Sequence, residues 1–397
     1  MARRLVSFGT EGTVFAREAA RPAPQPAMPA AMALPVLALE AVRTPARPGA
    51  APSLAAMSLT VGRGEIVTLL GPAGAGKSAT IAVVAGFLRA EVGQVLMKGE
   101  RITRLPAWKR DIGLVSATAD LFPDMTVLGN AAFPLEARGQ PRAEREEHAA
   151  AMLALWGIPP ALSASRPDAL PPPRRHRVAF ARALVHAPSL LLLDDPLGAL
   201  EGEDRAALAA DLLRLRAELG LTVLHATREA GLALDLSDRV AVIEGGRVRQ
   251  AGTPRDLYDT PLDPLVAALT GPCNRLAGQV LSIEGGTCMV RLDCGVTAMG
   301  MPVAGPEGPP VPGGRCTLVI RPERVAVAPL PPAEMGEDAV PARLLDQRFA
   351  GDHLRLRLAI GNGGELLCHR PPGLPLPALG EEASIAWDLP AARIHAG

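Results

Sequence analysis

The sequence predicts an α/β fold, in which helices cover a largely parallel sheet, followed by an all-β region. From Val36 to about Tyr258, short runs of leucine and β-branched residues alternate with longer helical stretches, the pattern of a parallel sheet with helices on its faces. A glycine-rich loop at residues 71–78 separates a strand-like run from a helix start, as in phosphate-binding proteins. After Pro272, short alternating strands lie between Gly and Pro turns, which favours a small β-barrel.

The composition limits the class of protein. At 397 residues the chain is long enough for two or three domains. Its 41 basic and 41 acidic residues balance, so no overall field favours nucleic acid or an anionic membrane as a partner. The five cysteines all lie in the last third and none are spaced C-x-x-C, so we expect free thiols rather than a zinc site. No apolar run reaches the roughly 18 residues that a membrane span needs.

The first residues differ in composition from the rest. Residues 1–33 are rich in Ala, Pro and Arg, and we expect them to form a disordered extension. The apolar stretch Ala27–Leu39 is interrupted by prolines and lies too far from the N-terminal arginines to serve in a signal peptide. The sequence does not distinguish among Met1, Met28 and Met32 as the true start.

The elements of the α/β region follow from hydrophobic runs and periodicity. We expect strands at Val36–Val42, Glu65–Leu70, Asp111–Val115, Leu190–Asp194, Thr222–His225 and Arg239–Ile243. We expect helices at Lys77–Arg89, Arg142–Trp156, Arg174–His186 and Glu201–Leu219. A helical insertion at about 119–187 interrupts the alternation, and the whole domain is expected to span 34–270.

The region 271–397 is expected to form a second domain, an all-β barrel similar to the oligonucleotide/oligosaccharide-binding fold. Its strands fall in two sets, which predicts a barrel built twice over. The expected strands are Leu276–Ile283, Cys288–Leu292, Cys316–Ile320, Ala339–Leu345, Leu354–Ala359 and Ala383–Trp387.

The loop Gly71-Pro-Ala-Gly-Ala-Gly-Lys-Ser78 is a complete G-x-x-x-x-G-K-[ST] motif. Its glycines let backbone N–H groups point at phosphate oxygens, and the following helix adds its N-terminal dipole. Lys77 would reach the β- and γ-phosphates, and the Ser78 hydroxyl would bind Mg²⁺. Only three lysines occur in the chain, so a lysine retained here indicates a need for a compact ammonium. The predicted nucleotide-binding residues are Gly71, Pro72, Ala73, Gly74, Ala75, Gly76, Lys77, Ser78 and Ala79.

Further strings give the chain a family resemblance. They are Arg110–Val115, Leu121–Asn130, Arg177–Leu184, Leu190–Leu197, Ser237–Arg239, Ala251–Pro254 and Ile320–Val325. With the phosphate loop they resemble the ATPase subunit of an ATP-binding-cassette (ABC) importer with a C-terminal transport-associated (TOBE) β-domain. Phe349–Asp352 and Trp387–Pro390 resemble the polyamine (spermidine/putrescine) type. The resemblance covers about residues 34–390.

The resemblance implies a P-loop NTPase cassette that binds ATP and Mg²⁺ at the cytoplasmic face of the inner membrane as a peripheral protein. Its implied partners are two membrane-spanning permease subunits and, through them, a periplasmic solute-binding protein, with no nucleic acid. Two cassettes, in a homodimer or a heterodimer, would sandwich two ATP molecules between them. Each site would join one subunit's phosphate loop to the other's signature motif. The preserved string Leu121–Thr126 would line the permease groove, although Phe122 and Met125 are equally compatible with a core role.

On the hydrolytic side, Asp194 matches the family's Mg²⁺-organising carboxylate, whereas three other positions depart from the family pattern. Asp194 ends an apolar strand and would hold Mg²⁺ together with Ser78. Asp195 stands where the family has a glutamate that polarises water; it is one methylene shorter, a misplacement that can cost about 10²-fold in rate. Arg228 replaces the switch histidine and can only donate hydrogen bonds; Asp195 and Arg228 are the altered catalytic candidates. His225, three residues earlier, is expected to be a core histidine. Ala117 replaces a glutamine that touches Mg²⁺, with Thr118 as a weak substitute.

The signature motif is altered most. The family's Leu-Ser-Gly-Gly-Gln is replaced by Leu170-Pro-Pro-Pro-Arg174. Proline has no N–H, so the phosphate-binding donors should be absent, although proline suits the first turn of a helix. Arg174 and Arg175 would then be either compensating charges or a solvated helix start.

Two readings of the function follow. The chain is either an importer ATPase that tolerates variant motifs, with impaired hydrolysis, or a non-catalytic, nucleotide-responsive regulatory or structural subunit. The lack of any aromatic residue between Phe15 and Phe87 removes the expected adenine-stacking partner, which lowers affinity by about 1–3 kcal/mol. A cassette acting in translation or DNA repair is disfavoured, because that class lacks the β-domain. The transported solute and the rate of hydrolysis are not readable from the sequence.

Overall fold

The computed structural model describes residues 34–46, 52–329 and 339–397. The expectations for residues 1–33, including the disordered extension and the alternative starts, lie outside these ranges. Residues Pro35–Gly397 form one unit. No helix in the described ranges is both long enough and apolar enough to cross a membrane.

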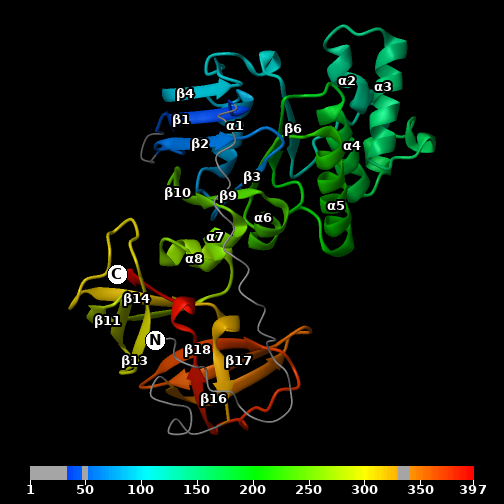
Figure 1. The fold of residues 1–397 in the computed structure, drawn as a ribbon. Coiled ribbons are helices and arrows are strands. Elements are labelled where there is room, and N and C mark those ends of the chain that lie inside the picture. The colour runs from blue at the N-terminus through cyan, green and yellow to red at the C-terminus, as the bar shows by residue number, and fades with distance from the viewer. Residues whose placement is uncertain (1–33, 47–51, 330–338) are drawn as a thin grey trace. The chain divides into compact units, whose positions relative to one another are not determined.

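A six-stranded sheet forms the centre of the α/β region (Figure 1), in the order β10-β9-β3-β8-β7-β6. Its strands are β3 (Ile66–Leu70), β6 (Ile112–Ser116), β7 (Leu190–Asp194), β8 (Val223–Thr227), β9 (Arg239–Glu244) and β10 (Arg247–Gly252). All neighbours pair in parallel except β10, which is antiparallel to β9. The expected parallel sheet is confirmed, and the expected strands match within two residues at each end.

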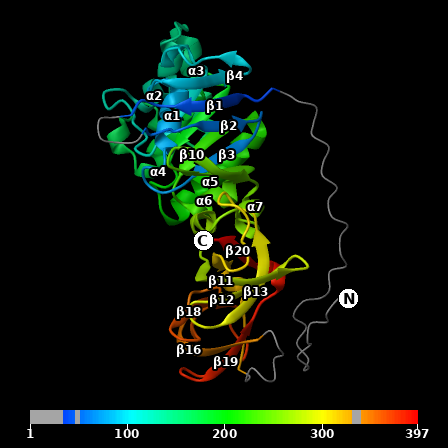
Figure 2. The same ribbon diagram turned by 90° about the vertical axis from the view of Figure 1, so that its left-hand side faces the viewer.

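A second, antiparallel sheet has the order β2-β1-β4-β5. Its strands are β1 (Leu37–Arg43), β2 (Met57–Val61), β4 (Val92–Met97) and β5 (Glu100–Arg101). Of these, only β1 was expected from the sequence. Strands β1, β2 and β4 lie close to α1 in both views (Figure 2), and their apolar residues share a core cluster with α1.

Eight α-helices are found in the described ranges: α1 (Lys77–Ala85), α2 (Val127–Glu136), α3 (Arg142–Leu155), α4 (Pro172–Leu184), α5 (Gly202–Leu219), α6 (Ala230–Leu236), α7 (Pro254–Asp259) and α8 (Pro264–Thr270). The helix expected at Lys77–Arg89 is shorter, because Gly86 takes a left-handed conformation (φ 89°) and its N–H bonds back to Ala82 and Val83. The helix expected to start at Arg174 starts at Pro172, since proline fits the first turn.

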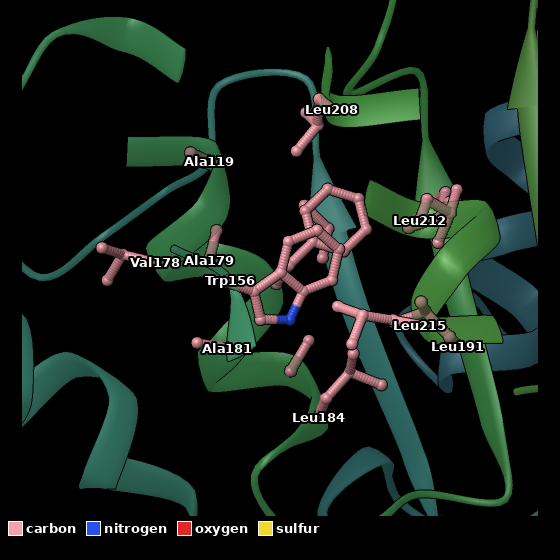
Figure 3. Packing of buried hydrophobic residues seen from close by; sticks show 14 of the residues in the cluster. Ala119, Trp156, Val178, Ala179, Ala181, Leu184, Leu191, Leu208, Leu212 and Leu215 are labelled. Atoms are coloured by element: carbon pink, nitrogen blue, oxygen red, sulfur yellow. The ribbon is translucent and has the colours of Figure 1, made fainter. Parts of the chain in front are cut away.

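Apolar clusters cover both faces of the central sheet. Leu191 and Leu193 of β7 belong to the cluster that includes α4 and α5. At its centre Trp156 stacks on Phe180 with ring centroids 4.5 Å apart (Figure 3). Leu190 and Leu192 belong to the opposite cluster, with α1. Alternate residues of the strand therefore face alternate layers.

The C-terminal strands form one closed barrel and one open sheet. The barrel has the order β11-β12-β13-β20-β14 and the sheet the order β15-β19-β16-β17-β18. The strands are β11 (Asn274–Glu284), β12 (Thr287–Leu292), β13 (Thr297–Val303), β14 (Arg315–Ile320), β15 (Ala326–Ala328), β16 (Val340–Phe349), β17 (Leu354–Ile360), β18 (Gly364–Arg370), β19 (Glu382–Ala386) and β20 (Ala392–Ala396). The expected all-β barrel is confirmed. The expectation of a barrel built twice over is wrong: the second strand set forms an open sheet, and β20 pairs with β13 and β14 of the first set.

Candidate functional site

A cavity of about 580 Å³ lies where β6, β7 and β8 end beside the phosphate loop. Its lining residues are Ser53, Ala73, Gly74, Gly76, Lys77, Ser78, Ala79, Ser116, Ala117, Thr118, Asp194, Asp195, Ala226 and Arg228. The structure thus brings together the loop, both aspartates, the arginine and the alanine that the sequence analysis selected. Gly71, Pro72 and Ala75, also selected, do not line the cavity.

The loop backbone is shaped to hold an anion. Gly76, at the N-terminus of α1, has φ 108°, a conformation that other residues rarely adopt. A Cβ on Gly71 would lie 2.4 Å from the Ile243 carbonyl oxygen, so the loop packs too closely on β9 for a side chain there. Within the described residues the backbone N–H groups of Lys77, Ser78 and Ala79 have no hydrogen-bond partner. These donors and the helix dipole fit a phosphate group.

Lys77 spans the loop. Its ammonium donates to the Gly71 carbonyl at 2.7 Å and to the Pro72 carbonyl at 2.8 Å. These contacts give Gly71 and Pro72 a supporting role outside the cavity wall. Burial and then Arg228 lower the pKa of Lys77, while the aspartates Asp195 and Asp194 raise it.

Ser78 and Asp194 place a hydroxyl and a carboxylate side by side in the cavity. The Ser78 hydroxyl donates to Asp194 Oδ1 at 2.9 Å, so its proton faces the carboxylate and its lone pairs remain free to bind a cation. Hydroxyl and carboxylate oxygens are the ligands that Mg²⁺ prefers. The donor set therefore fits the Mg²⁺ that accompanies a bound nucleotide.

Asp195 lines the same cavity in an unusual conformation. Its φ of 56° is left-handed, which is costly for a residue with a side chain. Its carboxylate accepts a hydrogen bond from the Thr227 hydroxyl at 2.7 Å. Burial raises its pKa, against the opposing effects of Thr227 and Arg228. A carboxylate near a phosphate site can act as a base, but part of its hydrogen-bonding capacity is already used by Thr227.

The switch position carries a guanidinium. Arg228 lines the cavity and lies near enough to Lys77 and Asp195 to influence the pKa of both. A guanidinium can only donate, so it can bind phosphate oxygens but cannot accept a proton from water. His225 is elsewhere: it is 1% exposed and its Nδ1 contacts the Thr68 hydroxyl at 3.2 Å. The expectation of a core histidine is confirmed.

The N-terminus of α4, where the signature motif falls, offers no free backbone donor in its first turn. Pro172 and Pro173 have no N–H, and the N–H groups of Arg174 and Arg175 both donate to the Pro171 carbonyl at 3.1 Å. The contrast with α1 is direct, since three N–H groups are free there. His176 of α4 contacts the Ala117 carbonyl through Nε2 at 2.9 Å, which ties this helix to the cavity wall.

Comparisons with known proteins agree with this geometry. The family model described as ABC transporter matches residues 54–198, and the model described as TOBE domain matches residues 318–394. A relative from Frankia alni, named spermidine/putrescine import ATP-binding protein PotA, is 37% identical over 322 residues, covering 80% of this chain and 69% of the relative. This chain belongs to the ABC transporter family.

Other relatives and solved structures support the assignment of this ABC family member. A protein from Rhizobium meliloti named Fe(3+) ions import ATP-binding protein FbpC 1 is 33% identical over 315 residues, covering 79% of this chain and 86% of that protein. The structure of cbiO1 from Clostridium perfringens, part of the ABC transporter complex cbiONQ, matches with a TM-score of 0.52 and 26% identity over 57% of this chain and 91% of that one. The dimeric cassette MJ0796 matches with a TM-score of 0.50 and 25% identity, covering 55% of this chain and 98% of that one.

Three cavity residues, Ser53, Ser116 and Ala226, were not selected in the sequence analysis. Ser53 belongs to the loop before β2, and Ser116 is the last residue of β6. For Ser116 a signal existed, because the carboxyl end of a parallel strand is where such sites form. For Ser53 there was none, since its place depends on how the segment packs against Gly76 and Gly246.

Proposed function

We propose that this chain is the ATP-binding subunit of an ABC importer for a polyamine or a similar small solute, with slow ATP hydrolysis. The observation that carries the proposal is the single cavity holding the free N–H groups of α1, Lys77 and the Ser78–Asp194 pair. The names of the relatives, which describe import of spermidine/putrescine or of Fe(3+) ions, support the importer role.

Nucleotide binding is the part of the proposal with the most support. The phosphate loop supplies cation, backbone donors and helix dipole, and the Ser78–Asp194 pair suits Mg²⁺. The proposed ligands are ATP and Mg²⁺. The nucleotide is bound by Ala73, Gly74, Gly76, Lys77, Ser78 and Ala79, and the residues Gly71, Pro72 and Ala75 shape the loop.

Slow hydrolysis follows from both halves of the composite site. On the chain's own side, Asp195 is held by Thr227, and Arg228 has no acceptor for a proton. On the side offered to a second cassette, α4 lacks the donors that would bind the γ-phosphate. A homodimer would be impaired twice in each site. In a heterodimer with an intact cassette, one site would have the γ-phosphate donors but poor catalysis. The other site would have good catalysis but no γ-phosphate donors.

The same α4 geometry favours a second candidate, a nucleotide-responsive regulatory or structural subunit that does not hydrolyse ATP. Both candidates share the same assembly: two cassettes, two membrane-spanning permease subunits and, through them, a periplasmic solute-binding protein. The proposed location is peripheral, at the cytoplasmic face of the inner membrane, with no nucleic acid involved. We also propose a domain division near residues 270–271, between the end of α8 and the start of β11.

Three measurements test the proposal. Calorimetry with Mg²⁺ and ATP should register binding to the purified chain, and no heat at all would refute the nucleotide-binding role. A steady-state ATPase assay, with and without permease subunits in liposomes, should give turnover well below about 1 s⁻¹, the low end of ordinary enzymes. Turnover at or above that rate would remove the case for slow hydrolysis. Uptake of labelled spermidine and of iron by a strain lacking this chain separates the two solutes.

A further inference from the structure

The position left by the missing glutamine is flanked by two hydroxyls. Ser116 and Thr118, on either side of Ala117, both line the cavity. Ser116 Oγ donates to Asp120 Oδ2 at 2.5 Å, and Thr118 Oγ1 donates to Asp120 Oδ1 at 2.6 Å. One carboxylate therefore receives the protons of both hydroxyls, and these two bonds are the leading cause of the lowered pKa of Asp120.

The sheet places Ser116 beside the proposed metal ligand. Ser116 of β6 is directly opposite Asp194 of β7 in the parallel register. Ile112 and Leu114, on the same side of β6 as Ser116, pack in the cluster that contains α1, as do Leu190 and Leu192 of β7. Because alternate residues share a face, the Ser116 hydroxyl and the Asp194 carboxylate emerge side by side on the face that carries the phosphate loop.

The loop that carries Asp120 is held in place from neighbouring elements. Ala119 and Asp120 have φ of 62° and 39°, a conformation that side-chain-bearing residues adopt at a cost. Arg182 of α4 donates to the carbonyls of both residues, at 3.1 and 2.9 Å. His176 contacts the Ala117 carbonyl. The surrounding contacts therefore fix the position from which Asp120 receives the two hydroxyl protons.

We propose that Ser116, oriented by Asp120, supplies the oxygen ligand to nucleotide-bound Mg²⁺ that glutamine supplies in other cassettes. The inference rests on the proposed binding of Mg²⁺ and ATP. Ser116 repeats the arrangement of Ser78: each hydroxyl donates its proton to an aspartate, which leaves its lone pairs free for a cation. Asp120 is a positioning residue, since it does not line the cavity itself.

The test measures metal affinity instead of turnover. Mn²⁺ replaces Mg²⁺, and its binding to the full chain saturated with a non-hydrolysable ATP analogue is followed by electron paramagnetic resonance. Ser116→Ala should weaken Mn²⁺ binding by about 10- to 100-fold, as loss of ligands and their supporting groups does in metal sites. Nucleotide affinity measured in EDTA should stay within about twofold of the parent, because the phosphate loop is untouched.

The chain offers a matched control. At the opposite end of the same strand pair, the Ser189 hydroxyl donates to Asp111, so Ser189→Ala removes an equivalent bond away from the cavity. It should leave Mn²⁺ affinity unchanged. If Ser116→Ala and Ser189→Ala both bind Mn²⁺ as tightly as the parent, the inference is wrong while the proposed function stands. A parent chain that binds no nucleotide would instead refute the proposed function.

A rescue separates positioning from a general structural role for Asp120. Asp120→Asn should weaken Mn²⁺ binding in the parent, because an amide accepts fewer hydroxyl protons than a carboxylate. In the double variant Ser116→Ala/Ala117→Gln the glutamine oxygen should restore the affinity, and Asp120→Asn should then have no further effect. Failure of that rescue, or an equal loss from Asp120→Asn in both backgrounds, would contradict the assigned roles.

Discussion

Lys77 illustrates how a single side chain is chosen by its surroundings. Its ammonium fits between two loop carbonyls that lie 2.7 and 2.8 Å away. A guanidinium is planar and larger, and it cannot occupy the same space with the same bonds. This explains why lysine is retained in a chain that otherwise uses arginine for nearly all its positive charges.

We therefore predict that Lys77→Arg weakens binding of Mg²⁺ and ATP by at least about tenfold, equivalent to the loss of one charged hydrogen bond. Lys98→Arg is the matched control, since Lys98 is exposed and lies outside the cavity. Isothermal calorimetry on both variants measures the difference. Equal affinities for the two would contradict the assigned role of the ammonium.

His225 links a buried ring to the pH dependence of stability. Burial lowers its pKa from 6.5 to about 4, so the folded chain holds it neutral while the unfolded chain protonates near pH 6.5. Its contribution to stability is therefore complete above pH 6.5 and is lost as the pH falls toward 4. Burial also lowers the pKa of His186 and the pKa of His395 to about 4.

We predict that the urea concentration at the midpoint of unfolding of the parent decreases as the pH is lowered from 6.5 to 4. His225→Asn keeps an acceptor for Thr68 and should flatten this fall, even if the variant is less stable at every pH because a cavity remains. If the urea midpoint of the variant decreases with pH as steeply as that of the parent, groups other than His225 control stability in acid.

At the scale of elements, the two helix starts define what the site can do. α1 presents free N–H groups to the cavity, whereas the prolines of α4 leave none in the first turn. α4 nevertheless forms, because proline suits the first positions of a helix. The prolines therefore leave the first turn of α4 without free N–H donors but do not prevent the helix from forming.

Restoring the backbone N–H donors at the N-terminus of α4 tests whether their absence prevents ATP-dependent dimerisation. The triple variant Pro171→Ser/Pro172→Gly/Pro173→Gly should form an ATP-dependent dimer that the parent does not, as measured by light scattering with Mg²⁺ and ATP. Each glycine should also lower the free energy of unfolding by up to about 1 kcal/mol. Dimerisation in the parent, or none in the variant at saturating ATP, would argue against loss of the clamp.

The C-terminal end of α1 depends on a buried arginine. Arg110 is 6% exposed, and its guanidinium donates to the carbonyls of Val83, Val84 and Leu105 at 2.6–3.0 Å. A methyl group on Gly86 would come within 2.9 Å of this guanidinium. The short α1 is therefore stabilised by a residue that follows it by more than twenty positions.

Arg110→Met should lower the free energy of unfolding by about 3 kcal/mol, because charged hydrogen bonds contribute about 1.5–3 kcal/mol and buried carbonyls lose their partners. Arg104→Met, at an exposed position, should change it by less than about 0.5 kcal/mol. Chemical denaturation of both variants provides the comparison. Similar midpoints would mean that water replaces the guanidinium at the carbonyls.

At the scale of the whole chain, the described lining of the cavity offers backbone N–H donors and Lys77 to a phosphate group but no aromatic surface to a base. None of its lining residues is aromatic, and the sequence has none between Phe15 and Phe87. Stacking is worth about 1–3 kcal/mol per base. The nucleotide should therefore be bound mainly through its triphosphate.

We predict that ATP, GTP and UTP bind within about threefold of one another, and that Ser53→Trp raises the affinity for the purine nucleotides by at least about fivefold, the equivalent of about 1 kcal/mol of stacking. Thr44→Ser, at a buried position next to the same loop, is the control. A parent that prefers ATP tenfold over UTP would contradict the prediction.

Local patterns in the sequence were enough to predict the central sheet, the phosphate loop and the face that carries Asp194. They failed where distant segments decide the outcome. β2 and β4 were missed because their pairing with β1 depends on residues far apart in the chain. The left-handed Asp195 and the link from Ser116 to Asp120 depend on packing that no local pattern reports. The open second sheet was missed for the same reason, since whether a sheet closes depends on pairing between strands far apart in the chain.

The position of β20 has a consequence for how the protein is made. During synthesis, β13 and β14 each keep one unpaired edge until β15 to β19 have been made and β20 can pair between them. Exposed strand edges recruit other chains, so this interval is when a nascent molecule is most open to aggregation. Crowded or fast production in a host cell should therefore harm the barrel sooner than the nucleotide-binding region, which can fold while the ribosome is still at work.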